Sequence, residues 1–226
     1  MSAPVPHEAI LLRPVNQVID VACGKVRKAE IYEYRLQLIE AAAARLGGFD
    51  IESFNGRFEI TPVKPISETK LAAAAIVSAL SRIDIHPALA LSALSREPLD
   101  DNARRTSGAH HTDFRLAQLI GRKAAELNVD RRSIIDPACG AGILLVATTL
   151  ETCGLDRLAT AKWLADRVHA CDVSASALRG ARLALASLTD DLDAITDMTR
   201  NWQVGDSLLR DPAAWASDCP GGFGAV

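Results

Sequence analysis

Three aspartates, Asp136, Asp172 and Asp206, each end a short segment with the length and composition of a strand. If these segments are neighbouring parallel strands, their carboxyl ends meet at one edge of a sheet, where ligands of such folds bind. A carboxylate at that edge accepts hydrogen bonds from the hydroxyl and amino groups of a ligand. A single Asp between a strand and a helix is more often only a helix N-cap. Three such acids in register predict a binding site.

The first acid opens a turn that contains two glycines. From Asp136 the sequence reads Asp-Pro-Ala-Cys-Gly-Ala-Gly, which sets Gly140 and Gly142 between an expected strand and an expected helix. Glycine lets the chain turn tightly and lets a ligand lie against the backbone. The third glycine of a dinucleotide-binding loop is missing, and no Gly-Lys-Ser/Thr of a phosphate-binding loop follows. The turn therefore favours a cofactor without phosphates.

The other two acids suit a nucleoside. Asp172 stands where an acid accepts from both ribose hydroxyls in nucleotide-binding folds. Asp206 is placed to accept from the exocyclic amino group of an adenine ring, and Val173 is placed to pack on that ring. With the glycine turn, these residues describe a pocket for S-adenosylmethionine.

The elements that must position these residues alternate between strands and helices from residue 104 onward. Such alternation is typical of an α/β fold, in which helices cover the faces of a parallel sheet. Ser174 is a natural N-cap for one of the helices. We expect strands at 133–136, 168–172, 202–206 and from 223 onward, and helices over 112–127, 142–152, 156–167 and 174–188.

Residues 1–103 are expected to form a mainly α-helical N-terminal domain with one hairpin. The hairpin is predicted around Asn55-Gly56, because this pair supplies the positive φ angles of a tight turn. A helix with a hairpin suits a winged DNA-binding unit, and a helical lid or packing domain is the alternative. The first 27 residues show little pattern, and the expected helices cover 28–46, 68–82 and 87–96.

The motifs of the second segment resemble those of the N-6 adenine-specific DNA methyltransferases. The turn that begins at Asp136 resembles the family's cofactor motif, with Ala141 where Ser is usual. Residues 105–113 resemble its Gly-x-x-Tyr-Thr-Pro element, which holds the methionine end of the cofactor. Here Thr112 keeps the polar contact, while His111 replaces the usual aromatic residue and Asp113 the usual proline.

Two further elements follow in the family's order. Residues 170–173, Ala-Cys-Asp-Val, resemble the ribose motif, and residues 204–207, Val-Gly-Asp-Ser, resemble the adenine-contact motif. The resemblance implies a Rossmann-like class I methyltransferase core over 104–226, with an incomplete parallel sheet. The cofactor-binding residues that it implies are His111, Thr112, Asp136, Pro137, Ala138, Cys139, Gly140, Gly142, Asp172, Val173, Asp206 and Ser207.

The family's catalytic element is Asn-Pro-Pro followed by an aromatic residue, and it follows a strand that residues 223–226 resemble. In the family, the Asn side chain and a Pro carbonyl accept the hydrogens of the adenine amino group, and the aromatic ring stacks on the flipped base. This element occurs nowhere in the 226 residues. We therefore assign no catalytic residue and expect a cofactor-binding half that is inactive alone.

The resemblance implies double-stranded DNA as the partner of the whole protein, together with a restriction or specificity subunit or domain. Two alternatives stay open. One is a class I methyltransferase acting on RNA, protein or a small molecule, and the other is a non-catalytic split or degenerate subunit.

The composition limits the remaining possibilities. A net charge of −3 does not support non-specific nucleic-acid binding by the whole chain. The 5 cysteines include no Cys-x-x-Cys pair, so neither a zinc site nor a disulfide framework is indicated. Cys139 is expected to fill the turn rather than to act as a nucleophile. No membrane helix or signal peptide is indicated, and we expect a cytoplasmic protein with no bound metal.

Overall fold

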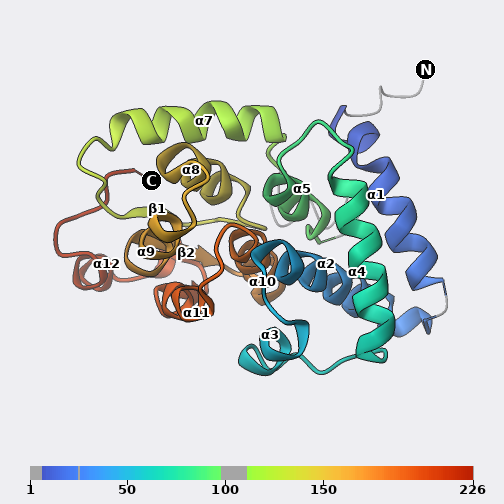
Figure 1. Cartoon of the computed structure of the whole chain (residues 1–226). Helices are drawn as coiled ribbons and strands as arrows, with labels where there is room; N and C mark the ends of the chain where they lie inside the picture. The colour runs from blue at the N-terminus through green and yellow to red at the C-terminus, as the bar shows by residue number, and fades with distance from the viewer. Residues whose placement is uncertain (1–6, 25, 98–110, 226) are drawn as a thin grey trace, which may run out of the picture.

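The computed structural model describes residues 7–24, 26–97 and 111–225. In this part of the chain the protein is mostly helical, with a small parallel sheet flanked by helices (Figure 1). The strands are β1 (Ile134–Asp136), β2 (Val168–Asp172) and β3 (Trp202–Val204). The α-helices are α1 (His7–Cys23), α2 (Ile31–Gly47), α3 (Ile51–Arg57), α4 (Ile66–Leu80), α5 (Pro87–Leu94), α7 (Phe114–Leu127), α8 (Ile143–Cys153), α9 (Arg157–Arg167), α10 (Ala175–Ala186), α11 (Leu192–Arg200) and α12 (Pro212–Asp218). The 3-10 turns η1 (Lys28–Glu30) and η2 (Ser207–Leu209) complete the described elements.

The sheet has the order β1-β2-β3, and both pairs of strands are parallel. The last described residues pair with β1 as well: Ala225 forms a parallel bridge with Ile134, and its carbonyl accepts from the Ile135 amide at 3.1 Å. Since Ile134 also pairs with β2, Ala225 lies at the opposite edge of β1. The chain therefore reverses its direction of winding beside β1, and a crevice at the carboxyl end of the sheet is the usual result of such a reversal.

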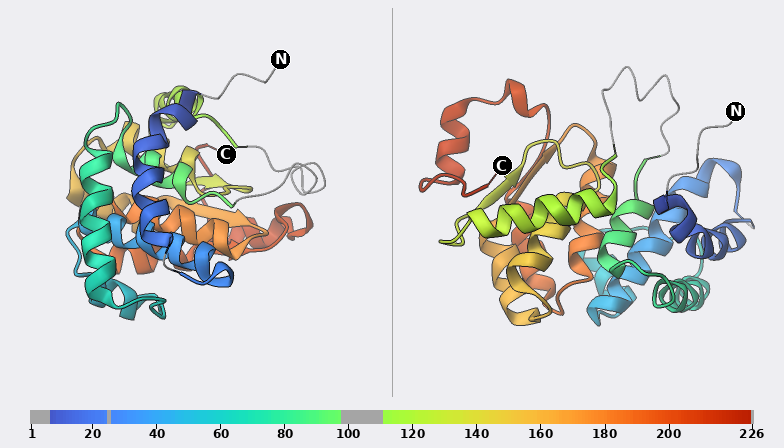
Figure 2. Two further views of the ribbon diagram at one scale, coloured as in Figure 1. Left: turned by 90° about the vertical axis from the view of Figure 1, so that its right-hand side faces the viewer. Right: turned by 90° about the horizontal axis from the view of Figure 1, so that it is seen from above.

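The two faces of the sheet have different coverings. The face toward α8 and α10 carries Ile134, Val168 and Ala170, which belong to the main hydrophobic core. On the other face His169 meets Phe223 edge to face, with 5.2 Å between the ring centroids. Figures 1 and 2 show α12 at one end of the molecule and α1 and α4 at the other, with α7 lying along α8.

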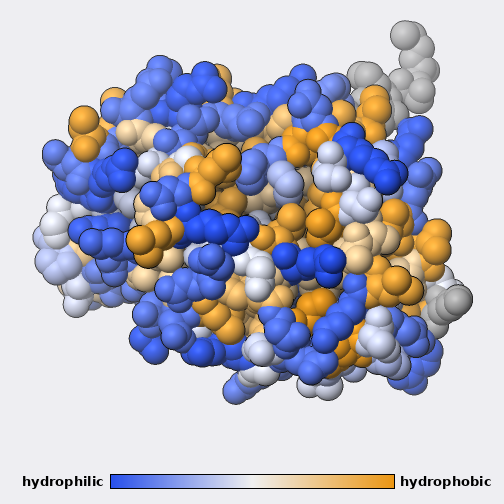
Figure 3. Space-filling view, in the orientation of Figure 1, coloured by the Kyte–Doolittle hydropathy of each residue, from blue (hydrophilic) through white to orange (hydrophobic). Residues whose placement is uncertain are grey.

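The N-terminal helices and the sheet share one continuous core of buried residues. The central helix is α2, which packs against α4 on one side and α10 on the other. Residues 41–44 of α2 are all alanines and all buried, so neighbouring helices can approach its backbone closely. On the face seen in Figure 3, hydrophobic side chains reach the surface more over the half with α2, α4 and α5 than over the half with α12.

Glu40, on the core side of α2, is a buried charge at the junction with α10. Its side chain is 1% exposed and accepts from Arg179 Nε at 2.8 Å and from Arg182 Nη2 at 3.1 Å. Arg179 also donates to both carboxylate oxygens of Glu33, each at 2.9 Å. A buried carboxylate is strongly disfavoured without such partners, so these contacts fix where α10 lies on α2.

The predicted hairpin is wrong, because residues 51–57 form α3. Asp50 caps this helix by accepting from the Ser53 amide at 2.9 Å. Ile51 and Phe54 are buried at a spacing of three residues, which is helical, and the Phe54 ring lies 4.8 Å from that of Phe58. The Asn-Gly pair falls in the last turn of α3, where tertiary packing and the cap outweigh its preference for a tight turn.

Besides α3, three α-helices were not expected: α1, α11 and α12. The region before residue 27 looks unpatterned because it contains Pro14, a residue that disfavours a helix interior. The helix α1 nevertheless continues through Pro14, and Leu12, Val15, Ile19 and Cys23 are buried at helical spacing. The strands agree with prediction, β2 over its full length and β1 and β3 in part, and the segment near 223 forms one bridge. All the helices that the sequence predicts are present, with ends that differ from the predicted ones by a few residues.

Replacing Glu40 with Gln is expected to lower the free energy of unfolding by roughly 3 kcal/mol, because two arginines then lose the buried partner charge. Glu33→Gln is the matched control, since the Glu33 side chain is 42% exposed and also pairs with Arg179. For the control we expect a loss below about 1 kcal/mol. Urea unfolding measures both variants. Equal losses would contradict the role of Glu40 in fixing α10.

Candidate functional site

The carboxyl edge of the sheet brings the predicted acids together. Asp136 ends β1 and Asp172 ends β2, and Asp206 lies two residues beyond β3. The backbone joins the last two ends, because the Gly205 amide donates to the Asp172 carbonyl at 2.9 Å. Asp206 also caps η2, accepting from the Leu208 amide at 2.9 Å. This contact fits the simple N-cap interpretation, and Oδ2 of Asp206 accepts no hydrogen bond from the described residues.

The glycine turn is closed by its own backbone and by β2. The Gly142 amide donates to the Cys139 carbonyl at 2.8 Å, and the Cys139 amide donates to the Cys171 carbonyl at 3.0 Å. Asp136 accepts from the Ala138 amide at 3.2 Å. The turn is thus attached both to the strand that precedes it and to the end of the neighbouring strand.

Asp172 holds the turn with its side chain. Its Oδ2 accepts from the Gly140 amide at 2.8 Å, and its Oδ1 accepts from the Ser174 amide at 2.9 Å. Each carboxylate oxygen can accept a second hydrogen bond, so the group is fixed in place and still able to bind hydroxyls. The next side chain, Val173, is 71% exposed and presents an apolar surface beside the carboxylate.

The two glycines of the turn differ in how much space lies beside them. Both have positive φ, +52° at Gly140 and +75° at Gly142. A Cβ on Gly142 would lie 2.6 Å from the Cβ of Ala181, so this glycine lets the start of α8 approach α10. A Cβ on Gly140 would meet no atom within 4 Å. The open side of the turn is therefore at Gly140, next to the Asp172 carboxylate.

Burial raises the pKa of both titratable side chains of the turn, the Asp136 carboxyl and the Cys139 thiol. Burial raises the pKa of Asp136, and the nearby negative charge of Asp172 raises it further. Burial also raises the pKa of Cys139 far above its usual range, with Asp136 and Asp172 adding to the effect. A thiol in this environment stays protonated and is a poor nucleophile, which fits the expected packing role of Cys139.

The upstream element is anchored by two charged residues that the sequence did not single out. Arg96 pairs with Glu8 of α1 and donates to the Thr112 carbonyl at 2.6 Å. Glu8 also accepts from the Phe114 amide at 3.2 Å. Glu8 lies in the region that looked unpatterned, and its partners are distant in sequence, so no local signal points to it.

Asp113 occupies the position where the resembling family has proline. It is the N-cap of α7, and its side chain accepts from the Arg115 amide at 3.0 Å. His111 is exposed and precedes this cap. Residues 105–110 of the same predicted element lie outside the described part of the chain.

The N-terminal helices also reach the glycine turn and the start of α10. Ser92 of α5 donates to the Ala141 carbonyl at 2.8 Å. Glu97 accepts from the hydroxyls of Ser174, at 2.7 Å, and of Ser176. Sequence reasoning missed these supports because each joins residues more than forty positions apart.

No protein-family model, curated protein or solved structure matches the chain. Within the described residues, no group of three or more His, Cys, Asp or Glu side chains is arranged to hold a metal ion. No helix of the same residues has the length and apolarity needed to cross a membrane.

The two glycines provide a matched test of the turn. Gly140→Ala is expected to cost about 1–2 kcal/mol, because its Cβ enters open space and only the left-handed backbone disfavours it. Gly142→Ala carries the same backbone cost and adds an overpacking cost of about 1–3 kcal/mol against Ala181. Urea unfolding compares the two variants. A smaller loss for Gly142→Ala than for Gly140→Ala would contradict the close approach of α8 and α10.

Asp136→Asn tests the electrostatics of the turn. A raised pKa in the folded state means that the ionised carboxylate destabilises the fold at neutral pH, so the neutral amide is expected to increase the free energy of unfolding at pH 7. This gain shrinks as the pH falls toward the ordinary Asp pKa of about 3.9, because Asp136 is then protonated in the folded protein as well. Chemical denaturation across this pH range measures it. A gain that is independent of pH would show that ionisation of Asp136 is not its cause.

Proposed function

We propose that the chain is the S-adenosylmethionine-binding part of an adenine-specific N-6 DNA methyltransferase. The single observation that carries the proposal is the Asp172 carboxylate at the end of β2. Two backbone amides hold it, and it lies beside the open turn at Gly140. This is the arrangement that a ribose needs at the carboxyl edge of a parallel sheet.

Each end of the cofactor has a matching group at this edge. The ribose hydroxyls donate to Asp172, and the exposed Val173 packs against the adenine ring. Asp206 and Ser207 lie beyond β3, where they accept from the adenine amino group. The methionine end lies toward the glycine turn, where its ammonium stabilises the ionised form of Asp136 and lowers the raised pKa of that side chain.

The turn and the upstream element position the methyl donor. Residues 137–140 form the surface on which the cofactor lies, and Gly142 sets the start of α8 behind it. Thr112 is held by Arg96 at the start of α7 and contacts the methionine end together with His111. Positioning of this kind contributes to catalysis by bringing the reactive methyl group to a fixed place.

The acceptor half of the reaction is assigned to no residue of these 226. In the proposed reaction the adenine amino nitrogen attacks the sulfonium methyl group, the carbon–sulfur bond breaks toward sulfur, and the amino group then loses a proton. Double-stranded DNA with a flipped adenine is the proposed substrate, and a restriction or specificity subunit is a proposed partner. The motif order, with the methionine-end element first, resembles that of the subgroup of the family whose target-recognition domain follows the catalytic domain.

Titration calorimetry with S-adenosylmethionine tests the proposal. We expect the wild-type chain to bind, and Asp172→Ala to bind about 30- to 1000-fold more weakly, because two hydrogen bonds to a charged acceptor are lost. Asp190→Ala is the control, since Asp190 is an exposed acid beyond the far end of α10 and should leave affinity unchanged.

Circular dichroism of the variants separates lost binding from lost folding. Wild-type affinity in a folded Asp172→Ala variant would contradict the ribose role of Asp172. Absence of binding by the folded wild-type chain would contradict the cofactor assignment itself.

A further inference from the structure

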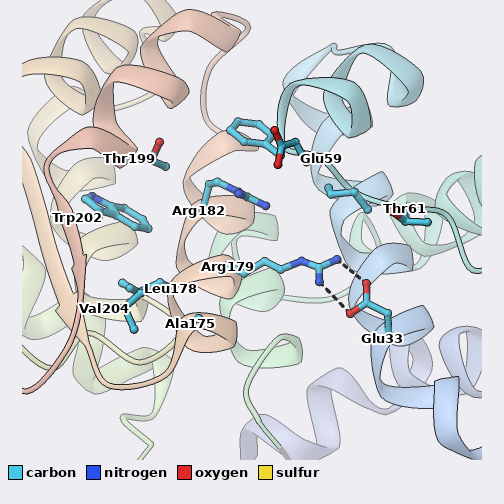
Figure 4. A pocket seen from close by; sticks show the side chains of 12 residues that line it. Glu33, Glu59, Thr61, Ala175, Leu178, Arg179, Arg182, Thr199, Trp202 and Val204 are labelled. Carbon is cyan, nitrogen blue, oxygen red and sulfur yellow. Dashed lines mark hydrogen bonds and ion pairs between the residues drawn. The ribbon is translucent and has the colours of Figure 1, made fainter.

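A cavity of about 520 Å³ lies between α10, β3 and the segment that follows α3 (Figure 4). This volume is within the range of pockets that bind small molecules. None of the three strand-end aspartates lines it, so the cavity does not belong to the edge described above. The residues that give it its character are Glu59, Leu178, Arg179, Arg182, Trp202 and Val204.

One side of the cavity is apolar. In Figure 4 Leu178, Trp202 and Val204 lie together, on α10 and β3. The Trp202 indole nitrogen donates to the Val168 carbonyl at 3.3 Å, which fixes the ring in its place beside the cavity. The Val204 side chain is 63% exposed, so this apolar surface is open to a ligand.

The other side carries a cation and an anion. Arg182 points toward this side in Figure 4, with its guanidinium 4.1 Å from the centroid of the Phe58 ring. Only Nη2 of Arg182 has a hydrogen-bond partner among the described residues, which is Glu40. Within the same residues, Glu59 makes no hydrogen bond or ion pair and has a positive φ of 52°. A left-handed backbone at a non-glycine residue beside a cavity is a reason to look for function.

The charges of the lining residues exclude a simple anion site. Arg179 is already bonded to Glu33 and Glu40, so it offers little to a ligand. The available groups are therefore one guanidinium donor on Arg182 and one carboxylate acceptor on Glu59. A ligand that satisfies both carries an acceptor anion and a donor cation close together, next to an apolar body.

We propose that this cavity binds a free α-amino acid with a large apolar side chain. The ligand's carboxylate accepts from Arg182 Nη1, its ammonium donates to Glu59, and its side chain lies against Leu178, Trp202 and Val204. Hydrogen bonds between charged groups are roughly twice as strong as neutral ones, so the two ends select for a zwitterion. This inference rests on the cavity alone and does not depend on the proposed methyltransferase function.

Nuclear magnetic resonance of the whole 15N-labelled chain tests the proposal with L-phenylalanine as the ligand. The chain has 3 tryptophans, and Trp202→Phe assigns the indole signal that belongs to the cavity. We expect L-phenylalanine to shift the Trp202 indole signal with a Kd of about 1 mM or tighter. The signals of Trp163 and Trp215, which do not line the cavity, should stay in place.

Two analogues test the zwitterion without changing the protein. L-phenylalaninamide lacks the carboxylate and N-acetyl-L-phenylalanine lacks the ammonium, so each should bind at least about tenfold more weakly. If either analogue bound with the same affinity as L-phenylalanine, the proposed contacts would be overturned. No shift of the Trp202 signal at about 10 mM L-phenylalanine, tenfold above the expected Kd, would overturn the proposal.

Two variants then assign the charged ends. Glu59→Gln and Arg182→Lys should each weaken L-phenylalanine binding at least about tenfold. Glu52→Gln is the matched control, because Glu52 is an exposed acid on α3 that does not line the cavity. Unchanged binding in a folded Glu59→Gln variant would remove Glu59 from the site, and equal weakening in Glu52→Gln would indicate a non-specific charge effect and overturn the proposal.

Discussion

The position of α10 depends on the buried carboxylate of Glu40. A charge that is 1% exposed needs partners in a fixed geometry, and both of its partners, Arg179 and Arg182, stand on α10. The helical part of the chain and the sheet are therefore joined by a directional contact as well as by apolar packing. This contact therefore helps to position the residues of α10 that lie near the carboxyl edge.

The position of α10 in turn constrains the position of the glycine turn. Ala181 of α10 lies against Gly142, which sets the start of α8, and Asp172, three residues before α10, holds the Gly140 amide. Ser92 and Arg96 support the same region from the N-terminal side. The candidate cofactor edge is thus built from both halves of the chain, and the N-terminal helices act as its support. The cavity beside β3 lies next to the junction of α2 and α10, because Arg182, which lines it, contacts both Glu40 and the ring of Phe58.

Much of the sheet and its edge is readable from the sequence, because the signals there are local. The strand 168–172 is found over its full length, and the acids at the strand ends lie at one edge as expected. The Asn55-Gly56 pair is misleading because burial of Ile51 and Phe54 on one side of a helix outweighs a turn preference. Pro14 is misleading for another reason, because proline disfavours a helix interior and yet lies inside α1.

The remaining features depend on contacts between distant segments. One supporting contact joins Glu8 to Arg96, 88 positions apart, and another joins Glu97 to Ser174, 77 positions apart. Neither the residue types nor their spacing predicts these contacts. Arg182 and Glu59 likewise come to line one cavity only after α3 has packed near α10. Local patterns therefore predict the acids and glycines of the site, while the residues that support the site and the cavity beside β3 depend on the folded structure.

The amide signal of Gly140 in a nuclear magnetic resonance spectrum reports on whether the cofactor binds at the carboxyl edge. Its nitrogen donates to Asp172 and its open side faces the place proposed for the cofactor. Gly154, at the opposite end of α8, also has a positive φ and open space beside it, so it is a matched control. On titration of the 15N-labelled chain with S-adenosylhomocysteine, we expect a large shift of the Gly140 amide signal and none of the Gly154 amide signal. A saturating titration that leaves Gly140 unmoved, or that moves both glycines equally, would contradict it.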